Sequence, residues 1–441
     1  MRVNPENPPS NRELNFVART GDPVHASIVG LFGLVGFAFG LWIAFYLKFP
    51  QVASALLLLV LTASPMVLVE FFVNRVYRRE SSGLDAREGK ADFSRLRRKY
   101  VGLLITFGWL AFLYWLFPEY DKSTYAPVWA LAVYLLPAAL ILAIPYFAWV
   151  DARQVEPEDA YSKIGAVVMR EKPVWAPEEF RNFLLGWGVK GFFLPIMLSF
   201  LGTNIGKLLA AGFSFETFPD FYLSLINLIF TLDVTFGAIG YLLTCRALDS
   251  HIRKPEFTAF GWFFTLICYP PFLSVISKSF VSLKEEQTWQ DILISTPCIY
   301  LTWGFVIILL LGVYVWATVC FGCRFSNLTN RGIITYGPYR YMKHPAYFFK
   351  CLAWWFLLTP FMSFSSLDLM VKACLLLCLK CGIYFARAKA EERLLSEDPA
   401  YVLYSEWIAQ FGVVAGMRRA LRNIVSGLRG PDNSKGDAPL A

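Results

Sequence analysis

The segment from Asn330 to Lys350, NRGIITYGPYRYMKHPAYFFK, concentrates polar and aromatic side chains between two strongly apolar stretches. Gly337 and Pro338 predict a turn, and His344 followed by Pro345 predicts a second break directly before a helix. Four tyrosines supply flat aromatic faces with hydroxyl ends: Tyr336, Tyr339, Tyr341 and Tyr347. Such a segment suits a ligand that is aromatic and cationic, although tyrosines of an interfacial belt beside a helix end give the same pattern.

A second group of polar residues follows in YFARAKAEERLL, where Arg387, Glu391 and Glu392 lie close together in the sequence. Arg387 and Glu391 are four residues apart, so a helix places them on one face. Taken alone, this spacing is more often explained by an ion pair on a solvated helix end. The group around Arg387 therefore indicates a functional site only together with the tyrosine-rich segment.

The two groups together resemble the C-terminal region of the isoprenylcysteine carboxyl methyltransferase family and its bacterial relatives. That family shows a segment similar to LVTxGxYxxxRHPxYxG, a helical hairpin, an RxxxEE element and a pair of tyrosines. This chain reads IITYGPYRYMKHPAYFF, then RAKAEE, then Tyr401 and Tyr404, so the resemblance covers about Asn330 to Trp407. The chain departs from the pattern at Lys343, where the family usually has Arg, and at Phe349, where it has Gly.

The resemblance implies a membrane methyltransferase that uses S-adenosylmethionine and acts on a lipophilic acceptor, such as an isoprenylcysteine carboxylate or a lipid head group. By this resemblance, Glu391 would bind the cofactor, and Arg387 would be the catalytic residue that meets the anionic group of the substrate. The further residues that would bind the cofactor are Ile333, Ile334, Tyr339, His344, Pro345 and Tyr347. The expected partner is a membrane lipid or a lipidated molecule, and no nucleic acid is expected.

These residue types also suit the chemistry of a sulfonium methyl donor. Such a donor needs aromatic and cation-stabilising contacts, carboxylates for its amino or ribose groups, and a dry site aligned for in-line attack. A carboxylate acceptor is already ionised and needs no general base, whereas an amine acceptor must first lose a proton. Because the chain contains no soluble G-x-G-x-x-G nucleotide fold, membrane helices and their ends must build the site.

Apolar helices must position these groups, because 56% of the 441 residues are hydrophobic, only 17% are charged, and the mean hydropathy is +0.48. Apolar runs of about 17 to 25 residues are long enough to cross a bilayer. We predict an all-α, polytopic integral membrane protein with about ten transmembrane helices. The predicted spans are Ala26 to Leu47, Val52 to Val73, Val101 to Phe117, Pro127 to Val150, Gly191 to Ala211, Phe221 to Thr244, Thr258 to Val275, Cys298 to Phe321, Phe348 to Met362 and Leu367 to Phe385.

The distribution of Lys and Arg predicts the orientation of these spans. The loop between the second and third spans is rich in both residues, every second loop after it is basic, and the alternate loops carry few such residues. Since Lys and Arg concentrate in cytoplasmic loops, we predict that both termini are cytoplasmic. The tyrosine-rich segment and the group around Arg387 then also lie on the cytoplasmic side.

The patterns divide the chain into three predicted parts. Residues 1–295 form an N-terminal transmembrane region of unknown role with about seven helices. Residues 296–415 form the methyltransferase-like catalytic region, and residues 416–441 a basic, partly disordered tail. Most of the nine Cys lie inside apolar runs and only three His are present, so no metal site is expected.

Three charged residues fall inside predicted spans: Asp233, Lys350 and Lys380. A single unpaired charge at the centre of a span costs about 2.5 to 3.5 kcal/mol on insertion scales. We predict that Lys350 and Lys380 face a cavity and bind an anionic group of the substrate, with snorkelling to the interface as the alternative. Asp233 is expected to pair with a polar group for structural reasons.

Two other classes of function remain open. Sterol-reductase-like, NADPH-dependent membrane oxidoreductases have a similar number of spans and an HxxY element before a late hairpin. They usually show a run similar to HRxxRDexxC, where this chain has ARAKAEERLL. A transporter or a non-catalytic lipid-binding protein would account for the large N-terminal helical region.

Overall fold

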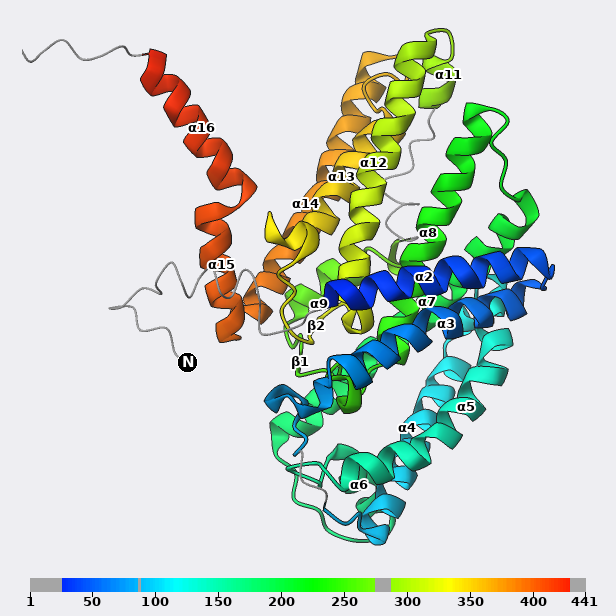
Figure 1. Ribbon diagram of the computed structural model, residues 1–441, viewed down its shortest axis with the longest axis vertical. Helices are drawn as coiled ribbons and strands as arrows, with labels where there is room; N and C mark the ends of the chain where they lie inside the picture. The colour runs from blue at the N-terminus through cyan, green and yellow to red at the C-terminus, as the bar shows by residue number, and fades with distance from the viewer. Residues whose placement is uncertain (1–25, 86–88, 274–286, 429–441) are drawn as a thin grey trace, which may run out of the picture.

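The computed structural model describes residues 26–85, 89–273 and 287–428, and this part of the chain is almost entirely helical (Figure 1). The predicted all-α, polytopic membrane fold is confirmed, because eight helices of the described residues are long and apolar enough to cross a membrane. These helices are α2 (Ala26–Tyr46), α3 (Gln51–Leu68), α4 (Phe93–Leu116), α5 (Ala126–Asp151), α7 (Pro177–Ala211), α8 (Phe218–Leu242), α12 (Pro297–Phe321) and α14 (Leu367–Leu395).

Shorter elements connect the long helices. A π-helical turn, Val69–Val73, continues α3. The shorter α-helices and the two strands are α6 (Ala160–Val168), α9 (Ala259–Leu266), α11 (Trp289–Leu293), α13 (Pro345–Leu358), α15 (Pro399–Phe411), α16 (Val413–Leu428), β1 (Lys254–Pro255) and β2 (Thr329–Asn330). Both chain ends lie outside the described residues, including residues 429–441 of the predicted basic, partly disordered tail.

The seventh predicted span, Thr258 to Val275, is not a helix of membrane length. It contains α9, whose eight residues extend only about 12 Å at roughly 1.5 Å per residue. Pro270 and Pro271 follow, and proline lacks an amide hydrogen and disfavours helical backbone in the residue before it. The predicted end at Val275 lies outside the described residues.

The ninth predicted span corresponds to α13, which has 14 residues. The described part of the chain therefore has eight membrane-length helices rather than about ten.

The hydrophobic core lies where α7, α8 and α12 pack together. Phe193, Phe236 and Ile307, one from each helix, are fully buried in one cluster. In Figure 1, α2 and α3 cross the long axis of the molecule on one side of this core, whereas α13 and α14 run beside α12. Because Phe193 and Phe236 precede residue 296 and Ile307 follows it, one continuous core joins the N-terminal and C-terminal helices.

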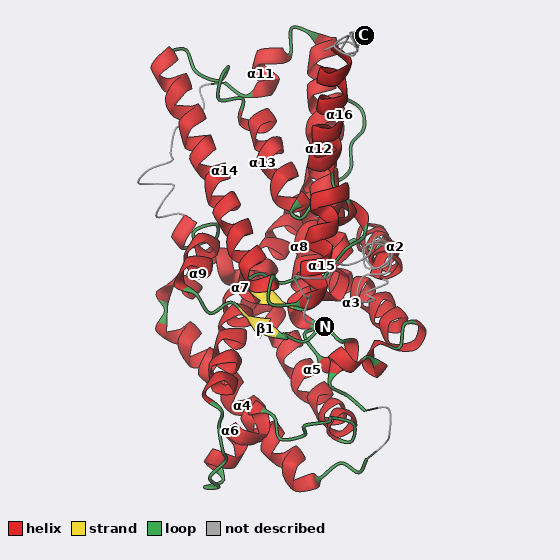
Figure 2. Cartoon of the chain, turned by 90° about the vertical axis from the view of Figure 1, so that its left-hand side faces the viewer, coloured by secondary structure: helices red, strands yellow, loops and turns green. Residues whose placement is uncertain are grey.

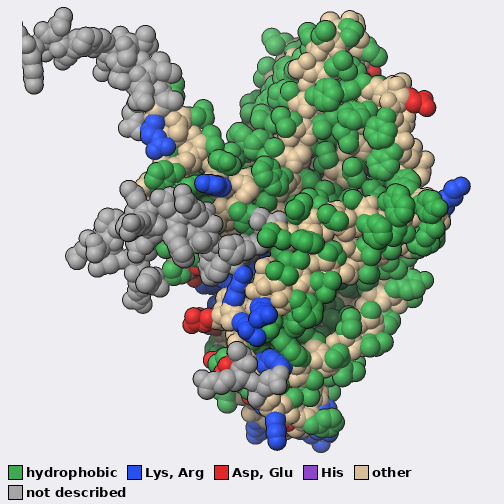
Figure 3. Space-filling view, in the orientation of Figure 1, with side chains coloured by type: hydrophobic (Ala, Val, Ile, Leu, Met, Phe, Trp, Pro, Cys, Tyr) green, Lys and Arg blue, Asp and Glu red, His purple; other side chains and the backbone are tan. Residues whose placement is uncertain are grey.

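The surface divides by polarity. Hydrophobic side chains cover most of the face in Figure 3, and most of the charged side chains gather toward its lower part. Large apolar side chains such as Trp42, Trp115 and Ile141 are exposed by 58%, 76% and 67%. Exposed apolar surface on this scale is typical of helices that contact lipid.

A short antiparallel pairing of β1 with β2 joins the loop after α8 to the loop after α12. Lys254 lies opposite Asn330, and Pro255 lies opposite Thr329. Figure 2 shows the two strands near the middle of the molecule. The pairing holds the start of the tyrosine-rich segment against a loop from the N-terminal part of the chain.

Candidate functional site

The tyrosine-rich segment contains both predicted breaks. Gly337 begins the 3-10 turn Gly337–Arg340 with a φ of 61°, and a Cβ at this position would lie 2.5 Å from Cys320 Sγ. Glycine is needed here because it alone combines a positive φ with so close an approach. Pro345 begins α13 directly after His344, as expected for a residue with a fixed φ and no amide hydrogen.

Arg387, Glu391 and Glu392 lie on the last turns of α14, which continues beyond the predicted end of the tenth span at Phe385. The unbroken helix keeps Arg387 and Glu391 on one face. Tyr347 of α13 lies against both: its hydroxyl donates to Glu391 Oε2 over 2.9 Å, and its ring centroid is 5.0 Å from Arg387 Cζ. The tyrosine-rich segment and the group on α14 therefore meet in space.

Helix α15 covers the tyrosine-rich segment from the other side. The Tyr404 hydroxyl donates to the carbonyl oxygen of Tyr339 over 2.6 Å, and Ile333 packs against Tyr401 and Tyr404. Burial raises the pKa of the Tyr339 phenol well above its ordinary value, and the Glu391 carboxylate raises it further. Tyr339 consequently remains a neutral phenol at any physiological pH.

Most of the predicted site residues line one cavity. They are Ile333, Ile334, Tyr339, His344, Tyr347, Lys350, Arg387 and Glu391. Pro345 is buried and does not line the cavity, but it begins the helix that carries Tyr347 and Lys350. Lys380 also lies outside the lining, with its Nζ 3.6 Å from the ring centroid of Trp354.

Arg387 is the most unusual group in this cavity, because the residue is only 6% exposed and its guanidinium has no counter-charge among the described residues. Its Nη2 donates to Asn327 Oδ1, and its Cζ lies 5.7 Å from the ring centroid of Tyr269. No carboxylate of the described residues lies within 4.0 Å of it, so the ion pair with Glu391 that the spacing allows is not formed. A buried charge without a partner is costly in a low-dielectric environment.

His344 fixes the arrangement of the two glutamates. Its Nδ1 lies 3.7 Å from Glu391 Oε2, and its Nε2 lies 3.3 Å from Glu392 Oε1. Its ring stacks on that of Tyr347 with 5.6 Å between centroids. Within the described residues, Glu391 Oε1 has no hydrogen-bond partner, so this oxygen is available to a ligand.

The other end of the cavity lies between the membrane-spanning helices. Tyr314 and Thr318 of α12 donate to Asp233 of α8 over 2.5 Å and 2.7 Å. The expected pairing of Asp233 with polar groups is therefore confirmed. Lys350 Nζ lies 3.4 Å from the Tyr314 hydroxyl, so a positive charge faces this end. The lining of the cavity thus extends from His344 to the polar side chains of Tyr314 and Thr318 inside the helices.

Sequence reasoning missed several residues that line the site. Tyr269 and Asn327 contact Arg387 from the loops after α9 and α12, and Tyr384 contacts it from the preceding turn of α14. Tyr314 and Thr318 carried a usable signal, because they lie four residues apart on one helix and a charged residue inside another span needs polar partners. Tyr384 carried a similar signal, because it lies three residues before Arg387 on the same helix. For Tyr269 and Asn327 we find no comparable signal in the sequence.

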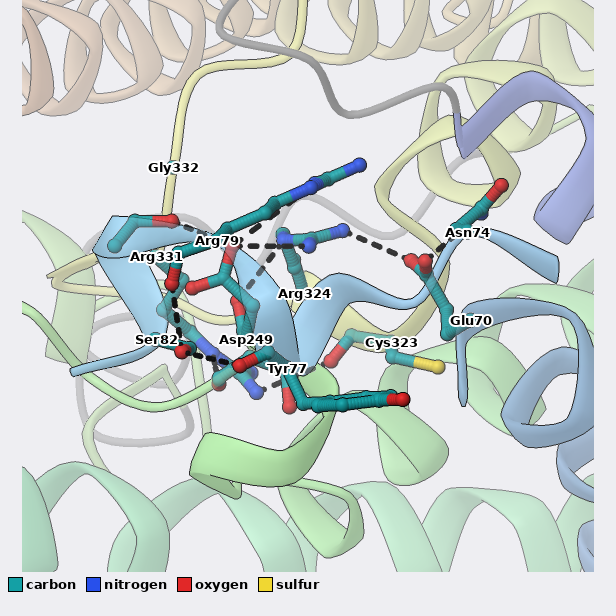
Figure 4. A network of polar contacts seen from close by, with 12 residues as sticks. Glu70, Asn74, Tyr77, Arg79, Ser82, Asp249, Cys323, Arg324, Arg331 and Gly332 are labelled. Atoms are coloured by element: carbon teal, nitrogen blue, oxygen red, sulfur yellow. Dashed lines mark hydrogen bonds and ion pairs between the residues drawn. The ribbon is translucent and has the colours of Figure 1, made fainter. Parts of the chain in front are cut away.

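A buried ionic network lies behind the site. Figure 4 shows Arg324 between two carboxylates: its Nη1 is 3.0 Å from Glu70 Oε1 and its Nη2 is 3.6 Å from Asp249 Oδ2. All three side chains are 1% exposed. Arg331, directly before Gly332 and Ile333, donates to the backbone carbonyl oxygens of Gly240, Ser250, Cys323 and Phe325. The network therefore fixes the start of the tyrosine-rich segment to the end of α3 and to the loop after α8.

Comparison with known proteins supports the interpretation of this region. The model of the isoprenylcysteine carboxyl methyltransferase (ICMT) family matches residues 300–397, which include α13 and all of α14. The resemblance of the C-terminal region to this family is thus confirmed, and the match supports a membrane methyltransferase of this type. Comparisons with curated proteins and with solved structures give no match.

Proposed function

We propose that the chain uses S-adenosylmethionine to methylate a lipophilic acceptor that carries an anionic group. The main support is Arg387, whose buried guanidinium has no carboxylate partner among the described residues and lines the same cavity as Glu391 and Tyr347. An anionic ligand would compensate this charge. Arg387 is therefore the residue proposed to bind the reacting end of the acceptor.

The other lining residues fit the cofactor. Ile333 and Ile334 are buried and offer apolar surface, and the rings of Tyr339 and Tyr347 can stabilise a sulfonium through cation–π contacts. Glu391 Oε1 can accept hydrogen bonds from amino or hydroxyl groups. When bound, S-adenosylmethionine supplies an activated methyl group for in-line transfer.

The acceptor site is proposed to lie between α12, α13 and α14. Lys350 and Arg387 provide two positive charges, and Asn327 orients the guanidinium of Arg387. A carboxylate acceptor needs no general base, so these residues have only to position it and exclude water. Tyr314 and Thr318 line the end within the spanning helix α12, where Lys350 also lies, so this end would receive a polar part of the acceptor.

We also propose that the mouth of the site faces the cytoplasm. The loops that flank it in the sequence belong to the basic set, and Lys and Arg concentrate on the cytoplasmic side of membranes. This orientation would give the site access to S-adenosylmethionine, which is a cytosolic compound.

Cofactor binding separates this proposal from the alternatives. The purified protein in nanodiscs is titrated with S-adenosylmethionine, S-adenosylhomocysteine and NADPH by calorimetry. We expect the two adenosyl compounds to bind and NADPH to give no heat. Binding of NADPH alone would favour a sterol-reductase-like enzyme, and a folded protein that binds none of the three would favour a transporter or lipid-binding protein.

A further inference from the structure

A second cavity lies between α5, α6, α7 and the loop that follows α8. Its volume is about 650 Å³, and none of its lining residues lines the first cavity. Sites for small molecules have volumes of this order. In Figure 1, α5 and α6 lie in the lower part of the molecule, away from α13 and α14. The cavity is therefore distinct from the candidate active site.

Two positive groups that line this cavity have no counter-charge among the described residues. Lys190 of α7 and Arg246 have no carboxylate within 4.0 Å among the described residues. Lys190 Nζ lies 3.8 Å from the ring centroid of Trp187, and Arg246 Nη1 donates only to the backbone carbonyl oxygen of Ser82. Arg253 is paired with a carboxylate, but its buried Nε has no hydrogen-bond partner.

The carboxylates that line the same cavity do not neutralise these positive groups. Asp159 lies 3.3 Å from Lys99, and Glu158 lies 2.8 Å from Arg98. Glu179 pairs with Lys163. The two remaining carboxylates, those of Glu156 and Glu178, belong to exposed residues, where solvent screens them. The uncompensated charge inside the cavity is consequently positive.

His251 gives a second sign of a positive environment. Its Nδ1 is buried and has no hydrogen-bond partner within the described part of the chain. Burial lowers its pKa to about 3, and the guanidinium groups of Arg246, Arg253, Arg331 and Arg324 lower it further. The ring is therefore neutral at physiological pH and can still hydrogen-bond a ligand.

Aromatic side chains also line this cavity: Tyr146, Phe147, Tyr161, Phe183 and Trp187. We propose that this cavity binds a phosphate-bearing ligand, with the phosphate at Lys190, Arg246 and His251. A phosphate offers several acceptor oxygens and matches several donors at once, which a single carboxylate does less well. The aromatic lining favours an anionic phospholipid, whose apolar part would lie along these rings, over free phosphate.

Native mass spectrometry of the purified full-length protein tests this inference. The protein is titrated with phosphatidylglycerol, with diacylglycerol of the same chains, and with inorganic phosphate. Phosphatidylglycerol should bind at least about tenfold more tightly than diacylglycerol. Lys190→Met should lose about tenfold of that affinity, whereas Lys207→Met, which removes the same charge from an exposed position on α7, should not.

Each outcome either supports or overturns the proposed phosphate site. Inorganic phosphate that binds the wild type and competes with the lipid would uphold the phosphate site but assign it to a free anion. Equal binding of phosphatidylglycerol and diacylglycerol, or equal binding to wild type and both variants, would mean an annular lipid and overturn the inference. Should Lys190→Met fail to fold, Arg246→Gln replaces it with the same expectation. Because none of these readouts needs S-adenosylmethionine, the result is independent of the proposed methyl transfer.

Discussion

Glu391→Gln is the substitution that separates the proposed cofactor site from a structural ion pair. It keeps the shape of the side chain and the carbonyl-type oxygen that Tyr347 needs, but it removes the charge. A charge-assisted hydrogen bond contributes about 1.5 to 3 kcal/mol. Since the Glu391 side chain is 32% exposed, we expect the lower part of this range, which corresponds to roughly 10- to 30-fold weaker binding of S-adenosylmethionine.

Calorimetry in nanodiscs measures this effect without knowledge of the acceptor. Glu397→Gln is the matched control, because Glu397 follows α14 directly, pairs with Lys254, and does not line the cavity. Its affinity for S-adenosylmethionine should equal that of the wild type. An unchanged dissociation constant in folded Glu391→Gln would refute the assignment of this part of α14 to the cofactor site.

Four further predictions concern the remaining polar groups. Arg387→Met should abolish turnover while changing the affinity for S-adenosylmethionine by less than about threefold in calorimetry, because we assign this residue to the acceptor. Lys350→Met should raise the KM for the acceptor, whereas Lys380→Met should leave it unchanged, because only Lys350 lines the cavity. Glu70→Ala removes one carboxylate partner of the buried Arg324 guanidinium and should lower stability by roughly 3 to 5 kcal/mol, seen as a lower midpoint of thermal unfolding. Burial lowers the pKa of His251 to about 3 in the folded protein, against about 6.5 in the unfolded chain. Between these pH values the unfolded state binds more protons, so the stability of the protein should fall as pH drops below about 6.5. The midpoint of thermal unfolding of His251→Gln should therefore depend less on pH in that window.

The local features of the site could be predicted because neighbouring residues determine them. Gly337 and Pro338 specify a turn in any context, His344 with Pro345 marks a helix start, and the spacing of Arg387 and Glu391 defines a helix face. The pattern of apolar runs similarly predicts the membrane helices. It misjudges the span that begins at Thr258, because hydropathy alone does not weigh the effect of two consecutive prolines on helical backbone.

The partners of buried charges could not be predicted, because they come from distant parts of the chain. Arg324 meets Glu70 across 254 residues, and Arg387 meets Asn327 across 60. Nothing in the local sequence distinguishes these pairs from solvated ones, because tertiary packing alone brings the partners together. The absence of an ion pair between Arg387 and Glu391 likewise depends on the rings of Tyr269 and Tyr347, which surround the guanidinium.

Methyl transfer itself tests the account most directly. Proteoliposomes that contain the purified protein are incubated with S-adenosylmethionine labelled in its methyl group and with a membrane lipid extract, and the label in the organic phase is counted. We predict that label enters a lipophilic product with the wild type and that Arg387→Met, although it still binds S-adenosylmethionine, transfers none. Equal transfer by Arg387→Met would contradict the acceptor site. A wild-type protein that neither binds S-adenosylmethionine nor transfers label to any lipid would contradict the proposed function as a whole.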